Sequence, residues 1–169
     1  ECVYNDFYVG KYCDVTIVAG CGISNCGGHD SRHDGIHTFH IEKDAHVRYI
    51  EKHYGEGTGT GKRLMNPTTE VNLGEGAVME MDTSQIAGIN DTYRITRAVI
   101  GPGASLIMHD KILTNLDQTA KAEIVVSLDG DGSKCDIISR GVAKGSSRQD
   151  IAIDIAGNSR CSMYQSYKV

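Results

Sequence analysis

The stretch LGEGAVMEM, residues 73–81, decides the fold because its pattern recurs along the chain. Each copy has alternating apolar residues, a short turn, one small residue and a second alternating apolar pair, which is typical of strand, tight turn and strand. The other copies are VGKYCDVTI (9–17), IEKDAHVRY (41–49), IGPGASLIM (100–108), LDGDGSKCDI (128–137, with one extra residue) and IAGNSRCSM (155–163). Such self-similarity at a fixed period indicates a repeat architecture.

The alignment predicts columns of inward-facing residues. The first-strand pairs are Phe7/Val9, Phe39/Ile41, Val71/Leu73, Ala98/Ile100, Val126/Leu128 and Ile153/Ile155. The small residues after the turn are Cys13, Ala45, Ala77, Ala104, Ser133 and Ser159. The second-strand pairs are Val15/Ile17, Val47/Tyr49, Met79/Met81, Leu106/Met108, Cys135/Ile137 and Cys161/Met163. The positions between these columns are mostly charged, as a solvent-facing side requires.

Turn-forming residues separate the copies, for example GEGTGTG at 55–61 and AGIND at 87–91. Two strands and two turns in each repeat of about 30 residues predict an all-β fold, a flattened parallel β-helix or solenoid. An antiparallel meander would use the same alternation. It gives no reason, however, for the same apolar and small positions to recur on every second strand.

The composition limits the classes of function. The 169 residues predict a single domain, 1–169, and the formal charge of −5 argues against a nucleic-acid partner. No stretch approaches the roughly 20 apolar residues that cross a bilayer, and the N-terminus lacks a signal-peptide pattern, so we expect a cytoplasmic protein without a membrane partner. The six cysteines are then expected to be reduced thiols.

Long continuous phrases of the sequence resemble the SufB/SufD family of iron–sulfur cluster assembly proteins, especially its short form. They are SRHDGIHTFHIEKDAHVRYIEKHYGEGTGTGKR (31–63), NPTTEVNLGEGAVMEMDTSQIAG (66–88) and ISRGVAKGSSRQDIAIDIAGNSRC (138–161). The resemblance implies a right-handed parallel β-helix core, normally flanked by helical regions that dock a SufC-like ABC-type ATPase as a partner. We expect those flanking regions to be absent from this sequence. It also implies a non-catalytic scaffold that binds a transient iron–sulfur cluster and pairs with a SufB/SufD-like protomer, as a homo-oligomer or dimer. After GNSRC the family pattern continues with a His and then a Cys, whereas this chain reads SMYQSYKV.

The loop from Cys21 to His33 carries the densest set of metal-binding side chains. Cys21, Cys26, His29 and His33 offer four ligands for zinc, iron or a cluster, since thiolate favours soft or borderline metals. Their spacing matches no standard finger, and a solvated glycine-rich turn is the plainer alternative. His37 and the nearby His40 are expected on opposite faces of one strand and therefore cannot grip one ion together.

Cys161 is a candidate sulfur acceptor at the last strand, against a purely structural role for the same thiol. Two functions rival the cluster-assembly scaffold. One is a metal-dependent enzyme that uses the Cys21–His33 loop, and the other is a structural solenoid that presents a binding face without metal.

Overall fold

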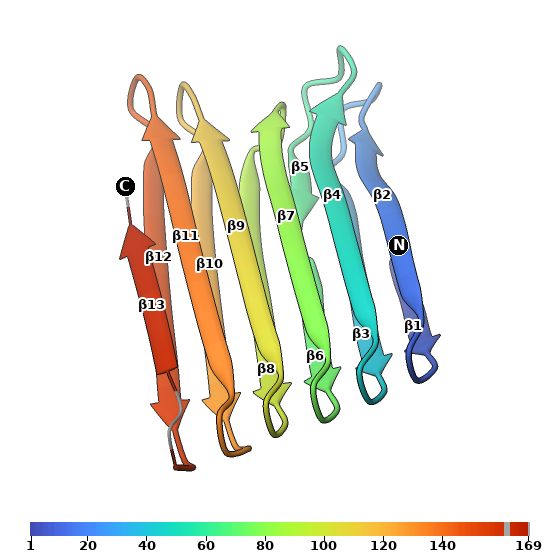
Figure 1. The fold of residues 1–169 in the computed structure, drawn as a ribbon. Helices are drawn as coiled ribbons and strands as arrows, with labels where there is room; N and C mark the ends of the chain where they lie inside the picture. The colour runs from blue at the N-terminus through green and yellow to red at the C-terminus, as the bar shows by residue number, and fades with distance from the viewer. Residues whose placement is uncertain (161–162, 169) are drawn as a thin grey trace.

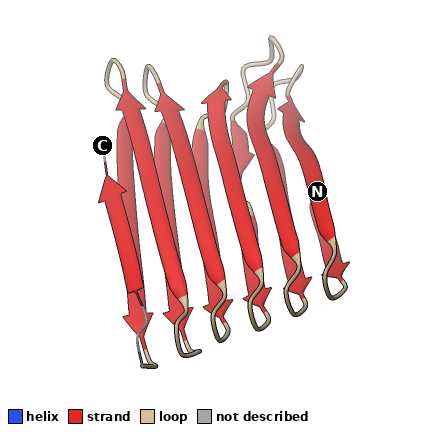
Figure 2. Cartoon of the chain, viewed as in Figure 1, coloured by secondary structure: helices blue, strands red, loops and turns tan. Residues whose placement is uncertain are grey.

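The chain folds into two layers of parallel strands, seen face to face in Figure 1 and coloured by element type in Figure 2. This computed structural model describes residues 1–160 and 163–168. The strands are β1 (Cys2–Val9), β2 (Asp14–Ser24), β3 (Ser31–Ile41), β4 (His46–Glu56), β5 (Arg63–Met65), β6 (Thr68–Leu73), β7 (Val78–Ala87), β8 (Asp91–Ile100), β9 (Ser105–Thr114), β10 (Thr119–Leu128), β11 (Lys134–Ala143), β12 (Arg148–Gly157) and β13 (Met163–Lys168).

The strands alternate between two sheets. One sheet holds β1, β3, β5, β6, β8, β10 and β12, and the other holds β2, β4, β7, β9, β11 and β13. Apart from β5, which is followed by β6 in the same sheet, each strand in one sheet is followed by a strand in the other, so the chain winds as a right-handed coil from the N-terminal end to the C-terminal end (Figure 1). The predicted solenoid with two strands per repeat is confirmed.

The repeat length is visible in the parallel register. Leu106, which pairs with Met79 on one side and Cys135 on the other, defines repeats of 27 and 29 residues. The first repeats are longer, because Val15 pairs with Val47, which is 32 residues away. One level of the first sheet is split into β5 and β6 around Pro67, which has no N–H to donate to the ladder.

The apolar columns form the core between the sheets. Phe39, Val47, Tyr49, Met79 and Leu106 are all fully buried. The columns are less buried toward the N-terminal end, where Phe7, Val15 and Ile17 of β1 and β2 are only partly buried. This is expected because no further turn stacks on them. The predicted inward positions of copies two to five are therefore confirmed.

The alignment of the sixth copy was wrong. In β12, Ile155 pairs with Val126 instead of Leu128, and Leu128 pairs with Gly157. In β13, Tyr164 pairs with Cys135, so that Met163 lies beside the exposed Lys134. The sixth turn follows the fifth at the same spacing of 29 residues. It therefore also has the extra turn residue of the fifth copy, which the sequence alignment did not assign to the sixth. Cys161, which the alignment placed with Met163 as the inward pair of the last strand, lies outside the described residues.

One corner of the coil is a uniform tight turn. The residue before the small position has a positive φ in five successive turns, and the small residue donates its N–H to the carbonyl three positions earlier. At Gly76, where φ is 67°, a Cβ atom would lie 2.2 Å from Oδ1 of Asp44 on the neighbouring turn. Both the backbone conformation and the close approach therefore favour glycine there.

The opposite corner carries two longer loops, residues 25–30 and 57–62, which stack on each other. The buried Asn25 side chain donates to the carbonyls of His29 and Lys62 at 2.8 and 3.3 Å. A Cβ at Gly59 would lie 2.4 Å from the carbonyl oxygen of Gly27. The glycines of the second loop therefore allow close stacking on the first. The described part of the chain has no helix long and apolar enough to span a membrane.

The column model predicts a sharp difference between two leucines of β9. Leu106→Ala is expected to lower the free energy of unfolding by about 3 kcal/mol, because the fully buried side chain leaves a cavity in a stacked core. Urea denaturation followed by circular dichroism measures this. The matched control is Leu113→Ala, on the same strand but 42% exposed, with an expected cost below about 1 kcal/mol. Equal costs for the two variants would contradict the assigned strand faces.

Candidate functional site

The interior of the solenoid is apolar in one half and polar in the other. The apolar half lies beside the tight turns, and the polar half begins where each strand continues past its second apolar residue. On β4 the inward series Val47 and Tyr49 continues with Glu51 and His53, both almost completely buried. On β7 it continues with Thr83 and Gln85. Buried polar groups require partners, and two of these side chains find theirs on the facing sheet. Glu51 lies 3.6 Å from Nδ1 of His37, and Thr83 accepts a hydrogen bond from Nη2 of Arg94 at 3.0 Å.

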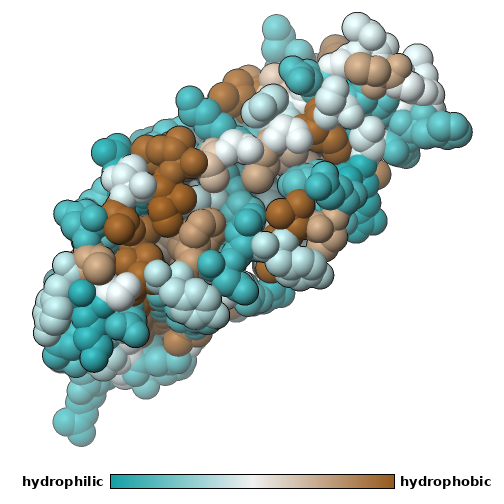
Figure 3. All heavy atoms as spheres, turned by 90° about the vertical axis from the view of Figure 1, so that its right-hand side faces the viewer, coloured by the Kyte–Doolittle hydropathy of each residue, from teal (hydrophilic) through white to brown (hydrophobic). Residues whose placement is uncertain are grey.

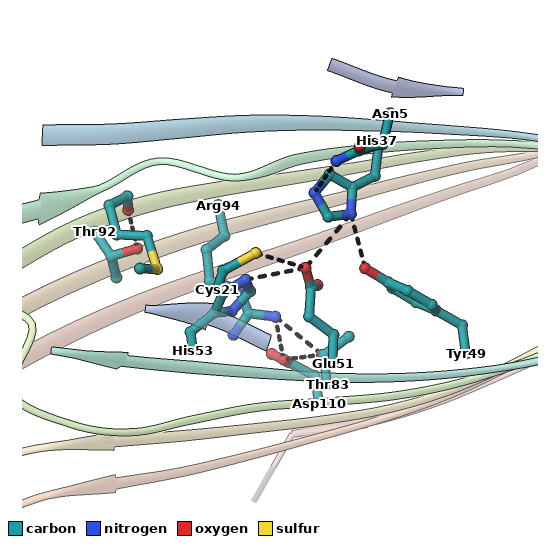
Figure 4. Close-up of polar contacts among 11 residues, drawn as sticks. Asn5, Cys21, His37, Tyr49, Glu51, His53, Thr83, Thr92, Arg94 and Asp110 are labelled. Carbon is teal, nitrogen blue, oxygen red and sulfur yellow. Dashed lines mark hydrogen bonds and ion pairs between the residues drawn. The ribbon is translucent and has the colours of Figure 1, made fainter. Parts of the chain in front are cut away.

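Three potential ligand atoms converge at the first two turns. Oε1 of Glu51 lies 3.6 Å from Sγ of Cys21 and 3.6 Å from Nδ1 of His37. The ligand atoms of Cys21, His37 and Glu51 all lie within 4.8 Å of one another. They come from β2, β3 and β4, so the site depends on both sheets (Figure 4).

Two further buried side chains complete the group. Nε2 of His53 lies 3.2 Å from Oε1 of Glu51, close enough for an ion pair although poorly aligned for a hydrogen bond. His53 is also the register partner of Cys21 on the adjacent strand. The hydroxyl of Tyr49 is 2.8 Å from Nδ1 of His37. The Nδ1 atom of His53 has no hydrogen-bond partner among the described residues.

The surroundings set the protonation states at neutral pH. Burial raises the pKa of the Cys21 thiol to about 12, with a smaller contribution from the charge of Glu51. Burial alone would raise the pKa of Glu51, but the contact with His53, together with His37 and Tyr49, lowers it to about 2. Burial lowers the pKa of His37 against the opposing effect of Glu51. The site therefore presents a carboxylate, a protonated thiol and a neutral His37 ring.

A cavity of about 420 Å³ leads from the N-terminal end of the solenoid to this group. Its lining includes Cys21, His37 and His33, with apolar side chains such as Phe7 and Ile17 around them. Figure 3 shows this end of the molecule, where apolar side chains reach the surface between polar ones. The half-buried Cys21 and the buried His37 thus border an opening toward the exterior.

The structure distributes the four predicted loop ligands. Cys21 lies in the buried group, and His33 lies beside His37, since both rings flank the position that a Cβ on Gly35 would occupy. Cys26 and His29 are exposed in the loop 25–30, where the Cys26 sulfur is 3.9 Å from the Ser24 hydroxyl. Cys26 and His29 contribute no ligand atom to the group formed by Cys21, His37 and Glu51. Cys161, the predicted sulfur acceptor, lies outside the described residues.

The polar interior continues along the coil axis beyond this group. Nη2 of the buried Arg94 lies 2.5 Å from Oδ1 of Asp110 and 3.0 Å from Oγ1 of Thr83. Ser139 donates to the other oxygen of Asp110 at 3.4 Å. These residues balance the Arg94 charge inside the core, as a buried ion pair requires.

Comparison with known proteins identifies the family. The family model described as "SUF system FeS cluster assembly, SufBD core domain" matches residues 8–162. The chain belongs to the SufBD family. It is 28% identical over 145 residues to an iron–sulfur cluster assembly SufBD family protein of Methanocaldococcus jannaschii. The alignment covers 85% of this chain and 45% of that relative, so the chain spans less than half of the relative's length. No solved structure matches the chain.

The sequence predicted one residue of this interior group, Cys21, as a candidate ligand and did not single out Glu51 or His53. The signal was present, because both follow Tyr49 at even spacing and therefore share its inward face. His37 was recognised as lying opposite His40, and the structure agrees: His37 is buried while His40 stacks on Tyr8.

The environment of Cys21 predicts that its thiol reacts slowly with alkylating reagents. A pKa of about 12 lowers the thiolate fraction at pH 8 on the order of a thousandfold relative to an ordinary cysteine, so alkylation of Cys21 should lag far behind that of the exposed Cys26. Timed iodoacetamide labelling with fragment mass spectrometry measures both rates in one peptide. Glu51→Gln should accelerate Cys21 and leave Cys26 unchanged. Equally fast labelling of both thiols in the unaltered chain would contradict the buried, acid-flanked environment of Cys21.

The ionised Glu51 also predicts how stability depends on pH. Its pKa is lowered from 4.5 to about 2 in the fold, so its contribution, about 3 kcal/mol at most, is present above pH 4.5 and is lost as the pH falls toward 2. Glu51→Gln should therefore flatten the fall in urea midpoint between pH 5 and pH 3. The control is Glu70→Gln, an exposed carboxyl on β6. An unchanged pH profile in Glu51→Gln would show that the carboxyl is not ionised in the fold.

Proposed function

We propose that this SufBD core acts as a non-catalytic scaffold in iron–sulfur cluster assembly, in a SUF-type system driven by an ABC-type ATPase. The family match over residues 8–162 carries this proposal. The curated relative is itself named as an iron–sulfur cluster assembly protein. Regions of SufBD proteins outside the core would dock the ATPase, and the iron–sulfur cluster would be a transient cargo.

The interior group supports this function chemically. Cys21, His37 and Glu51 supply a thiol, an imidazole and a carboxylate, which are the ligand types that bind iron in proteins. The cavity at the N-terminal end gives iron or sulfide a route to them. Cys26 and His29 of the adjoining loop and His33 of β3 remain predicted ligands, and Cys161 remains a predicted sulfur acceptor.

The strand edges support self-association or pairing with a SufB/SufD-like protomer. β1 and β2 end the two sheets on one side, and β12 and β13 end them on the other. A sheet edge presents unpaired N–H and C=O groups that can extend onto another chain. We propose that one of these ends forms the protomer interface, so that the cluster is assembled close to it.

Anaerobic reconstitution with ferrous iron and sulfide tests the proposed function. The purified chain should take up both elements and develop thiolate-to-iron absorption, and the Cys21→Ser/Cys26→Ser double variant should lose most of it. Metal and sulfide analysis gives the stoichiometry. Cys13→Ser, which removes an exposed thiol elsewhere, is the matched control and should behave as the unaltered chain. A folded protein that binds neither iron nor sulfide would overturn the assignment of cluster assembly to this core.

A further inference from the structure

We propose that Cys21, His37 and Glu51 form a site for one divalent transition-metal ion of borderline softness, such as ferrous iron, inside the first two turns. The inference deepens the proposed function, on which it rests only for the view that the bound ion is iron destined for a cluster. The site would receive the metal ion alone, before sulfide.

The distances fit a single ion. Metal–sulfur bonds near 2.3 Å and metal–nitrogen or metal–oxygen bonds near 2.0–2.2 Å place the ligand atoms of a tetrahedral site about 3.4–3.6 Å apart. The two measured separations from Oε1 of Glu51, to Sγ of Cys21 and to Nδ1 of His37, are both 3.6 Å. Two of the three separations therefore already fit one ion, and the third, between the ligand atoms of Cys21 and His37, lies within 4.8 Å and would shorten on binding. The Tyr49 hydroxyl would have to release Nδ1 of His37.

A buried histidine whose ring nitrogens lack hydrogen-bond partners points independently to a missing ligand. His53 is 1% exposed, and neither of its ring nitrogens makes a well-aligned hydrogen bond among the described residues. Its Nε2 atom nevertheless lies 3.2 Å from the carboxylate oxygen that the other two ligands face. His53 therefore acts as a positioning residue: it holds the Glu51 carboxylate in place while that carboxylate binds the metal ion.

Charge also favours a cation. Glu51 is buried, and within the described residues its ion-pair partners are histidines, with no Lys or Arg among them. The nearby Arg94 is already paired with Asp110. A buried carboxylate without a full positive charge is costly, and a bound metal ion would supply that charge.

The donor set selects the class of ion. One thiolate, one imidazole and one carboxylate suit iron(II), zinc or cobalt(II) better than the hard ions magnesium and calcium. An assembled iron–sulfur cluster is held mainly by several cysteine thiolates, and this interior group has one. The geometry is therefore suited to a single ion, with an open fourth position toward the cavity that Cys21 and His37 line.

Cobalt(II) is the probe, because it reports both thiolate ligation and tetrahedral geometry in its absorption spectrum. Anaerobic titration of the metal-free chain should saturate at one ion per chain, with a sulfur-to-cobalt charge-transfer band. Cys21→Ser should abolish that band, and Glu51→Gln should weaken binding strongly. His53→Gln, which changes a contact behind the ligand, should weaken it about 10–100-fold. Cys26→Ser is the matched control and should retain both the band and the affinity.

Circular dichroism and urea midpoints establish that each variant is folded. The inference is wrong if the folded chain binds no cobalt, or if the charge-transfer band survives in Cys21→Ser and disappears in Cys26→Ser. Comparison with iron–sulfide reconstitution separates the two proposals. Iron and sulfide uptake without cobalt binding would remove the interior ion site and leave the scaffold function standing. Cobalt binding without iron and sulfide uptake would support the interior ion site and remove the scaffold function.

Discussion

The whole structure depends on parallel register between successive turns. Because every strand lies directly on the equivalent strand of the next turn, a side chain at an inward position always packs against its counterparts above and below. The column Val15, Val47, Met79, Leu106 and Cys135 shows the result. Side-chain size may vary along such a column, but its direction may not, since a slip of one residue would turn the whole strand inside out. The uniform tight turns preserve this register by giving each turn the same reversal.

The same register that builds the apolar core also brings together the polar group. Cys21 and His53 are far apart in sequence but adjacent in the sheet, because a 32-residue repeat separates them. Glu51 then meets His37 from the facing sheet across the interior. A buried carboxylate, two histidines and a thiol add no hydrophobic stabilisation at this place, so this part of the polar half of the interior is a candidate for a chemical role.

The sequence allowed the fold to be predicted in detail because the repeat signal is redundant. Four copies share both the apolar columns and the small residue, so one poor match does not disturb the assignment. The sixth copy failed for the opposite reason: it lies at the end, and Ile155 resembled Leu128 more than the true partner Gly157 does. At the site, Cys21 was predicted but was grouped with sequence neighbours in a loop, whereas it lies on β2. Its actual companions come from other strands, and only the 32-residue spacing and the inward parity after Tyr49 could have located them.

The direction of the backbone hydrogen bonds fixes the length of this domain along the coil axis. All the pairings that join one turn to the next run along the coil axis, and neighbouring strands in a sheet are about 4.8 Å apart. Six turns therefore hold the two open ends roughly 24 Å from each other. Gain or loss of one repeat would move whatever is attached at one end by a single fixed step and leave the side faces unchanged.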